Sequence, residues 1–156
     1  MIINMKNKVI LILMFYISYI YNCNAKNIEF EVTGKAIIEG FLLSDNSSYK
    51  IYKSEGYWKS SLGDYGLNNC YGILENDIEK KINLNILCKY SSKDNENIIF
   101  KFTRNSSFQD AGMGKATIID ASKKYKYLIG TNCSHAVSYV EDAFFAMQNC
   151  KLINDQ

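Results

Sequence analysis

A thiol, a hydroxyl and the only imidazole of the chain stand side by side at Cys133, Ser134 and His135. Nucleophilic catalysis by cysteine needs a free thiolate with a base beside it. On an extended strand, residues 133 and 135 share a face but lie about 6.5–7 Å apart, which is long for a direct hydrogen bond. A disulfide at Cys133 would also remove the nucleophile. We therefore expect no catalytic residue here and interpret His135 as a surface or half-buried histidine.

Two groups of residues could bind a metal ion. The oxygen-bearing side chains of Asp94, Asn95, Glu96 and Asn97 could ligate calcium. This run lacks the length and the glycine of a calcium-binding loop, so a solvated hairpin turn is the preferred interpretation. The cysteines contain no C-x-x-C pair, which argues against a zinc site. We expect neither a metal nor another cofactor.

Three aromatic residues flank the short segment SSLGDYG and are the candidate ligand-binding residues: Tyr57, Trp58 and Tyr65. Aromatic side chains next to small polar residues can line the mouth of a barrel or a surface that binds a partner. Aromatic side chains also fill barrel cores, and for Trp58 the core is the preferred interpretation.

The first 25 residues have the three parts of a secretory signal peptide: a short basic stretch, an apolar run of about a dozen residues, and small or polar residues ending in Ala25. The apolar run is shorter than the roughly 20 residues that span a bilayer. We expect cleavage after Ala25, and therefore a periplasmic or secreted bacterial protein. An uncleaved anchor and lipid attachment at Cys23 are the alternatives.

Loss of Cys23 with the signal peptide leaves an even number of cysteines, which in an exported chain indicates disulfides. Cys70 and Cys88 are 18 residues apart, and Cys133 and Cys150 are 17 apart, each pair with polar turn residues between its members. A hairpin would place each pair on facing positions, within disulfide reach. Of the three possible pairings, the sequence therefore favours Cys70 with Cys88 and Cys133 with Cys150.

The charge of the chain excludes one class of function. It carries 18 basic and 16 acidic residues, and both Lys6 and Lys8 leave with the signal peptide. A mature net charge near zero argues against nucleic-acid binding, which needs a basic surface. No linker interrupts residues 26–156, so we expect a single domain there.

The apolar residues of the mature chain follow a period of two. In KKINLNILCKY the residues Ile82, Leu84, Ile86, Cys88 and Tyr90 share one face, and NIIFKFTR and IEFEVTG alternate in the same way. Turn signals recur every 8–14 residues or so. This spacing predicts an all-β fold, an antiparallel meander of about eight strands closed into a small barrel, with a β-sandwich as the alternative. Residues 140–150, VEDAFFAMQNC, are also open to a helix.

The order of several motifs resembles that of small secreted bacterial β-barrel proteins related to the allene oxide cyclase barrel. The motifs are GDYGLNNCYG, NILCKYSSKDNEN, Gly112-Met113-Gly114 and ASKKYKYLIG, and they cover about residues 65–135. Two glycines of the pattern are replaced, one by Glu96 or Asn97 and one by Lys123. The resemblance implies a barrel fold, and it carries over no catalytic residue.

These observations lead to three functional hypotheses. The first is a non-catalytic binding module for a small apolar or amphipathic ligand or for an envelope component. The second, by fold analogy, is an enzyme of the isomerase or cyclase type. The third is a secreted interaction protein that acts through its loops. A chamber with converging ionisable side chains would favour the enzyme, an apolar cavity with one polar anchor would favour binding, and an exposed aromatic surface around Trp58 would favour interaction.

Overall fold

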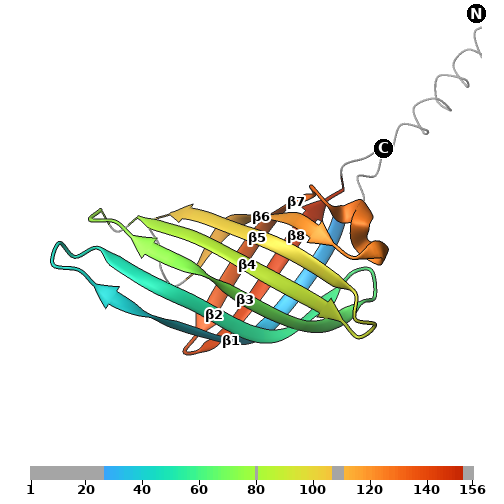
Figure 1. Cartoon of the computed structure of the whole chain (residues 1–156), viewed down its shortest axis with the longest axis horizontal. Helices are drawn as coiled ribbons and strands as arrows, with labels where there is room; N and C mark the ends of the chain where they lie inside the picture. Colours follow the sequence, from blue (N-terminus) through green and yellow to red (C-terminus); the bar gives the residue numbers. More distant parts are fainter. Residues whose placement is uncertain (1–26, 80, 107–110, 153–156) are drawn as a thin grey trace, which may run out of the picture.

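A computed structural model of the chain describes residues 27–79, 81–106 and 111–152 (Figure 1). The predicted signal peptide, residues 1–25, lies outside these ranges, so its cleavage stays a prediction. Among the described residues, no helix has both the length and the apolar character needed to cross a membrane.

Eight antiparallel strands and one short helix make up the described chain. They are β1 (Asn27–Leu42), β2 (Ser48–Ser60), β3 (Tyr65–Asn76), β4 (Ile82–Ser92), β5 (Asn97–Ser106), β6 (Ala111–Ala121), the 3-10 helix η1 (Lys123–Leu128), β7 (Asn132–Val140) and β8 (Ala143–Lys151). Each strand pairs with the next, and β8 pairs with β1. The sheet therefore closes on itself, which confirms the predicted barrel rather than the sandwich.

The period of two sorts the side chains between the interior and the outside of the barrel. In β4, Ile82, Ile86 and Tyr90 are buried, whereas the alternate residues Asn83 and Lys89 are exposed. A one-residue slip would turn every inward side chain outward, so this alternation fixes the register of each strand.

One end of the barrel is filled by an aromatic cluster made of Phe30, Trp58, Tyr90 and Phe100. The rings of Phe30 and Phe100 meet edge to face at 5.3 Å, and those of Trp58 and Tyr90 stack at 5.7 Å. Helix η1 lies at this end (Figure 1) and adds buried side chains to the same core. Burial of each large ring contributes roughly 1.5–3 kcal/mol, so this end is the stable base of the barrel.

Both predicted disulfides are present. Cys70 in β3 is bonded to Cys88 in β4, and Cys133 in β7 to Cys150 in β8. The members of each pair occupy directly facing positions on adjacent strands, with Cα atoms 4.0 and 3.9 Å apart. Each bridge therefore staples one hairpin.

Two segments differ from simple expectations. Residues 143–151 form strand β8 and not the alternative helix, since Phe144, Ala146 and Gln148 alternate inward with a period of two. Lys123 and Lys124, which the sequence marks as a turn, form the start of helix η1.

Four tyrosines, Tyr49, Tyr52, Tyr125 and Tyr127, are expected from the sequence to be half-buried strand residues, and the structure places them differently. Tyr125 is buried in η1, whereas Tyr127 in the same helix is exposed. The three-residue turn of a 3-10 helix places residues two positions apart on different sides. In β2, Tyr52 points into the barrel, whereas Tyr49 points outward and is exposed.

Candidate functional site: a chamber inside the barrel

A chamber of about 70 Å³ lies inside the barrel, between the aromatic cluster and the end that carries the β1–β2 turn. Its volume is several times the roughly 10–15 Å³ that one water molecule needs. The walls are mainly apolar and include Val32, Ile86, Leu84, Val137 and Phe144. The barrel is therefore packed solid at one end only.

A wider depression, which we call the mouth of the chamber, adjoins it. The two spaces share four lining residues, Ile38, Leu74, Ile82 and Tyr139. The mouth has a volume of about 380 Å³, within the range of roughly 300–1,000 Å³ that is typical of small-ligand sites. Its outer edge carries the charged residues Lys50, Glu141 and Asp142.

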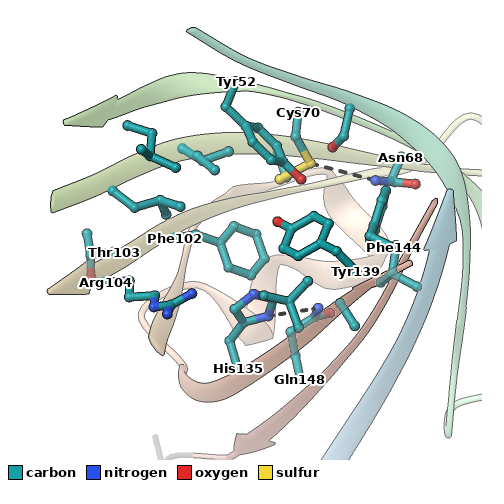
Figure 2. Close-up of a pocket in the computed structure, with 18 of the residues that line it drawn as sticks. Tyr52, Asn68, Cys70, Phe102, Thr103, Arg104, His135, Tyr139, Phe144 and Gln148 are labelled. Carbon is teal, nitrogen blue, oxygen red and sulfur yellow. Dashed lines mark hydrogen bonds between the residues drawn. A yellow bond between two sulfur atoms is a disulfide. The ribbon is translucent and has the colours of Figure 1, made fainter. Parts of the chain in front are cut away.

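Polar side chains enter the chamber from six strands. They are Tyr52 and Ser54 (β2), Asn68 (β3), Tyr90 (β4), Arg104 (β5), His135 and Tyr139 (β7) and Gln148 (β8). All stand at inward positions of their strands. Figure 2 shows Arg104 of β5 and His135 and Tyr139 of β7 directed toward the same space.

A hydrogen-bonded chain holds the imidazole of His135. The hydroxyl of Tyr90 donates to Oε1 of Gln148 over 3.2 Å, and Nε2 of Gln148 lies 3.3 Å from Nδ1 of His135. The ring of His135 also meets Phe102 edge to face, with centroids 4.7 Å apart. Gln148 is only 1 % exposed, so its amide is fixed within the core.

The environment of the chamber favours the neutral forms of its titratable groups. Burial, and then the positive charge of Arg104, lowers the pKa of His135 to about 4. Burial and hydrogen bonding with Tyr52 raise the pKa of the Tyr139 phenol, and burial raises that of Tyr90. At neutral pH, His135 is therefore uncharged and both phenols keep their protons.

Two buried polar atoms of the chamber have no hydrogen-bond partner among the described residues. They are Oγ of Ser54, which is 2 % exposed, and Oδ1 of Asn68, which is 1 % exposed. The amide nitrogen of Asn68 is engaged, because it donates to Sγ of Cys70 (Figure 2). An unpaired buried polar group costs about 1–3 kcal/mol, so these atoms favour a polar group brought in from outside the protein.

Glycine makes room for the only arginine. The guanidinium of Arg104 lies where a side chain at Gly112, on the neighbouring strand β6, would start. A larger residue at this position would displace the guanidinium from the chamber wall.

The three candidate ligand-binding residues do not lie together. Trp58 is 2 % exposed, belongs to the aromatic cluster and donates from Nε1 to the carbonyl of Ser91. Tyr57 and Tyr65 point outward and are 69 % and 54 % exposed. None of the three lines the chamber or its mouth. A ligand-binding role for them stays a prediction that concerns the outer surface.

The structure also places the candidate nucleophile and the candidate metal-binding residues. Cys133 is in a disulfide, so it has no free thiolate that His135 could activate as a nucleophile. Asp94 lies in the β4–β5 turn, where its backbone N–H and that of Glu96 are bound by the hydroxyl of Ser92. Within the described part of the chain, no three His, Cys, Asp or Glu side chains are grouped so that they could hold a metal ion.

Sequence reasoning did not single out Arg104, Gln148, Tyr139, Ser54 or Asn68. The signal in the sequence was their position among the residues that point into the barrel, which alternate along each strand with residues that point outward. Arg104 continues the inward series of Phe100 and Phe102, and Gln148 stands between the inward residues Ala146 and Cys150. A polar residue on the apolar face of a strand indicates an internal polar site.

The fold and the chamber define a small, disulfide-stapled, eight-stranded antiparallel β-barrel with an internal cavity. A solved structure described as that of an enzyme from Penicillium herquei is similar to it, with a TM-score of 0.54 and 13 % sequence identity over 78 % of this chain and 90 % of the other. At this identity the likeness concerns the fold alone. No family model and no curated protein matches the chain.

Proposed function

We propose that the protein binds a small amphipathic molecule inside the barrel, as a non-catalytic binding module. The observation that carries this proposal is the pair of unpartnered polar atoms, on Ser54 and Asn68, in a chamber whose walls are mainly apolar. A ligand with an apolar body and polar groups would satisfy these atoms while it covers the apolar walls. The chamber would hold the inner part of the ligand, and the mouth its outer part.

The lack of a free thiol among the described residues supports binding over covalent chemistry that uses cysteine. All four cysteines of the described chain are in disulfides, and the hydroxyls of Tyr90 and Tyr139 are protonated at neutral pH. The two disulfides are also what an oxidising compartment favours. This agrees with the proposal of a periplasmic or secreted protein.

An isomerase or cyclase is the second candidate. One observation favours it: Arg104, His135, Tyr52 and Tyr139 converge on a single chamber. Side chains that donate hydrogen bonds can stabilise charge that develops on an oxygen during a rearrangement. The structural neighbour described as an enzyme adds an argument by fold analogy.

Native mass spectrometry of the protein purified from the cell that makes it tests the proposal. A retained small molecule that leaves on denaturation is expected. Ala146→Leu, which fills the chamber, should reduce the retained fraction, whereas Ala136→Leu adds the same atoms on the exposed face of β7 and should not. A protein that carries no such molecule, and that binds none of a set of small amphipathic compounds, would refute binding. Conversion of a bound compound into an isomer would favour the enzyme.

A further inference from the structure

The orientation of the Gln148 amide follows from the needs of Tyr90. The ring of Tyr90 is surrounded by Phe30, Trp58 and Phe100, none of which offers a strong acceptor to its hydroxyl proton. Oε1 of Gln148 is the one acceptor that this hydroxyl has among the described residues. A flipped amide would present its NH₂ group to Tyr90 instead and leave the phenol proton unpaired, at a cost of about 1–3 kcal/mol.

The amide orientation in turn fixes the tautomer of His135. With Oε1 directed at Tyr90, the NH₂ group of Gln148 donates to Nδ1 of His135. A neutral imidazole whose Nδ1 accepts a hydrogen bond carries its proton on Nε2. No hydrogen-bond partner of Nε2 occurs in the described part of the chain, and His135 lines the chamber. The imidazole therefore offers the chamber an N–H donor and no free lone pair.

We propose that His135 recognises the ligand by donating from Nε2–H to an oxygen of that ligand, so that the ligand carries a carbonyl or carboxylate oxygen at its buried end. This inference rests on the proposed function and adds the chemical class of the ligand. The fixed positive charge of Arg104 in the same chamber wall disfavours an ammonium group there. Tyr90 and Gln148 are positioning residues, because they act through the imidazole.

The tautomer can be measured without any ligand. The chain has one histidine, so the ¹⁵N and ¹³C signals of its imidazole are assigned without ambiguity. The Nε2–H pattern is expected at pH 7 in the unliganded protein. In Tyr90→Phe the amide of Gln148 is free to flip, and the Nδ1–H form should become populated. Tyr125→Phe removes another buried tyrosine hydroxyl, which lies in η1 and makes no hydrogen bond with Gln148, and should leave the pattern unchanged. A wild-type protein in the Nδ1–H form would overturn the inference.

Three matched probes test the ligand class: acetophenone, ethylbenzene and 1-phenylethylamine. One hydrogen bond should make acetophenone bind roughly three- to tenfold more tightly than ethylbenzene, with the amine weakest. Binding is followed by the chemical shifts of the chamber methyl groups. His135→Phe should abolish the advantage of acetophenone, and His135→Gln, which keeps an N–H donor, should restore part of it.

The outcomes separate the two proposals. Equal binding of acetophenone and ethylbenzene would overturn the ligand class and leave the proposed function intact. Tighter binding of the amine would overturn it in the same way. If none of the three probes binds, and the wider set of amphipathic compounds also fails, the proposed function fails and the ligand class fails with it.

Discussion

Acid should destabilise the protein through His135. The pKa of this imidazole is about 4 in the folded chain against about 6.5 in an unfolded one. The unfolded chain therefore takes up a proton as the pH falls below 6.5, while the folded protein resists protonation until about pH 4. Because the unfolded state binds more protons in this window, the free energy of unfolding falls as the pH is lowered.

The size of the effect follows from the two pKa values. Relative to pH 7.5, the free energy of unfolding should be lower by roughly 1 kcal/mol at pH 5.5 and by roughly 2–3 kcal/mol at pH 4.5. Above pH 7 the contribution should be constant, since both states are then uncharged at this residue.

Urea unfolding is the assay, and the only tryptophan is its probe. Trp58 is buried in the aromatic cluster, so its fluorescence reports loss of the barrel base. His135→Gln keeps a polar side chain next to Gln148 but does not titrate. The difference between wild type and variant removes the contribution of the carboxylates, because both proteins have the same ones. If both proteins lose the same free energy between pH 7.5 and 4.5, the imidazole is not held neutral and the reasoning is wrong.

Three further predictions use the same unfolding assay. Gly112→Ala should lower the free energy of unfolding by about 1–3 kcal/mol, because its methyl group competes with the guanidinium of Arg104; an unchanged value would show that the two do not meet. Replacing Cys70 and Cys88 together by alanine should cost about 3 kcal/mol by release of the closed loop, and a cost near zero would contradict a stapled hairpin. Glu141 has a φ of 57° in the β7–β8 turn, a conformation that glycine adopts at lower cost than other residues. Glu141→Gly should therefore stabilise the protein by about 0.5–1 kcal/mol, and a loss of stability would show that the backbone of Glu141 is not strained.

The architecture was accessible from the sequence because strand patterning is a local property. The alternation through Ile82, Ile86 and Tyr90 can be read without any knowledge of partners, and each turn signal lies within a few residues of the turn that it makes. The cysteine pairs followed from the same logic, since hairpin partners are close in the sequence. Closure of the sheet followed from the number of strands.

The chamber was not accessible in the same way. Ser54, Asn68 and Arg104 belong to three different strands, and their meeting depends on the stagger of the barrel, which no short segment encodes. Trp58 and Tyr57 show what the sequence could give. The two were grouped as candidate ligand-binding residues with the core as the preferred place for Trp58, and adjacent residues of a strand face opposite sides, so Trp58 lies in the core and Tyr57 in solvent.

The join between β1 and β8 has a consequence for how the barrel assembles and opens. Phe30 lies opposite Gln148 there, more than a hundred positions away along the chain, whereas every other strand pair is a neighbour in sequence. Neither sulfur bridge crosses this seam. The β1–β8 hydrogen bonds can therefore break while both disulfides and their hairpins stay intact. We expect this pairing to form last during folding, because it joins the residues that are farthest apart in the sequence, and its amide hydrogens to exchange first.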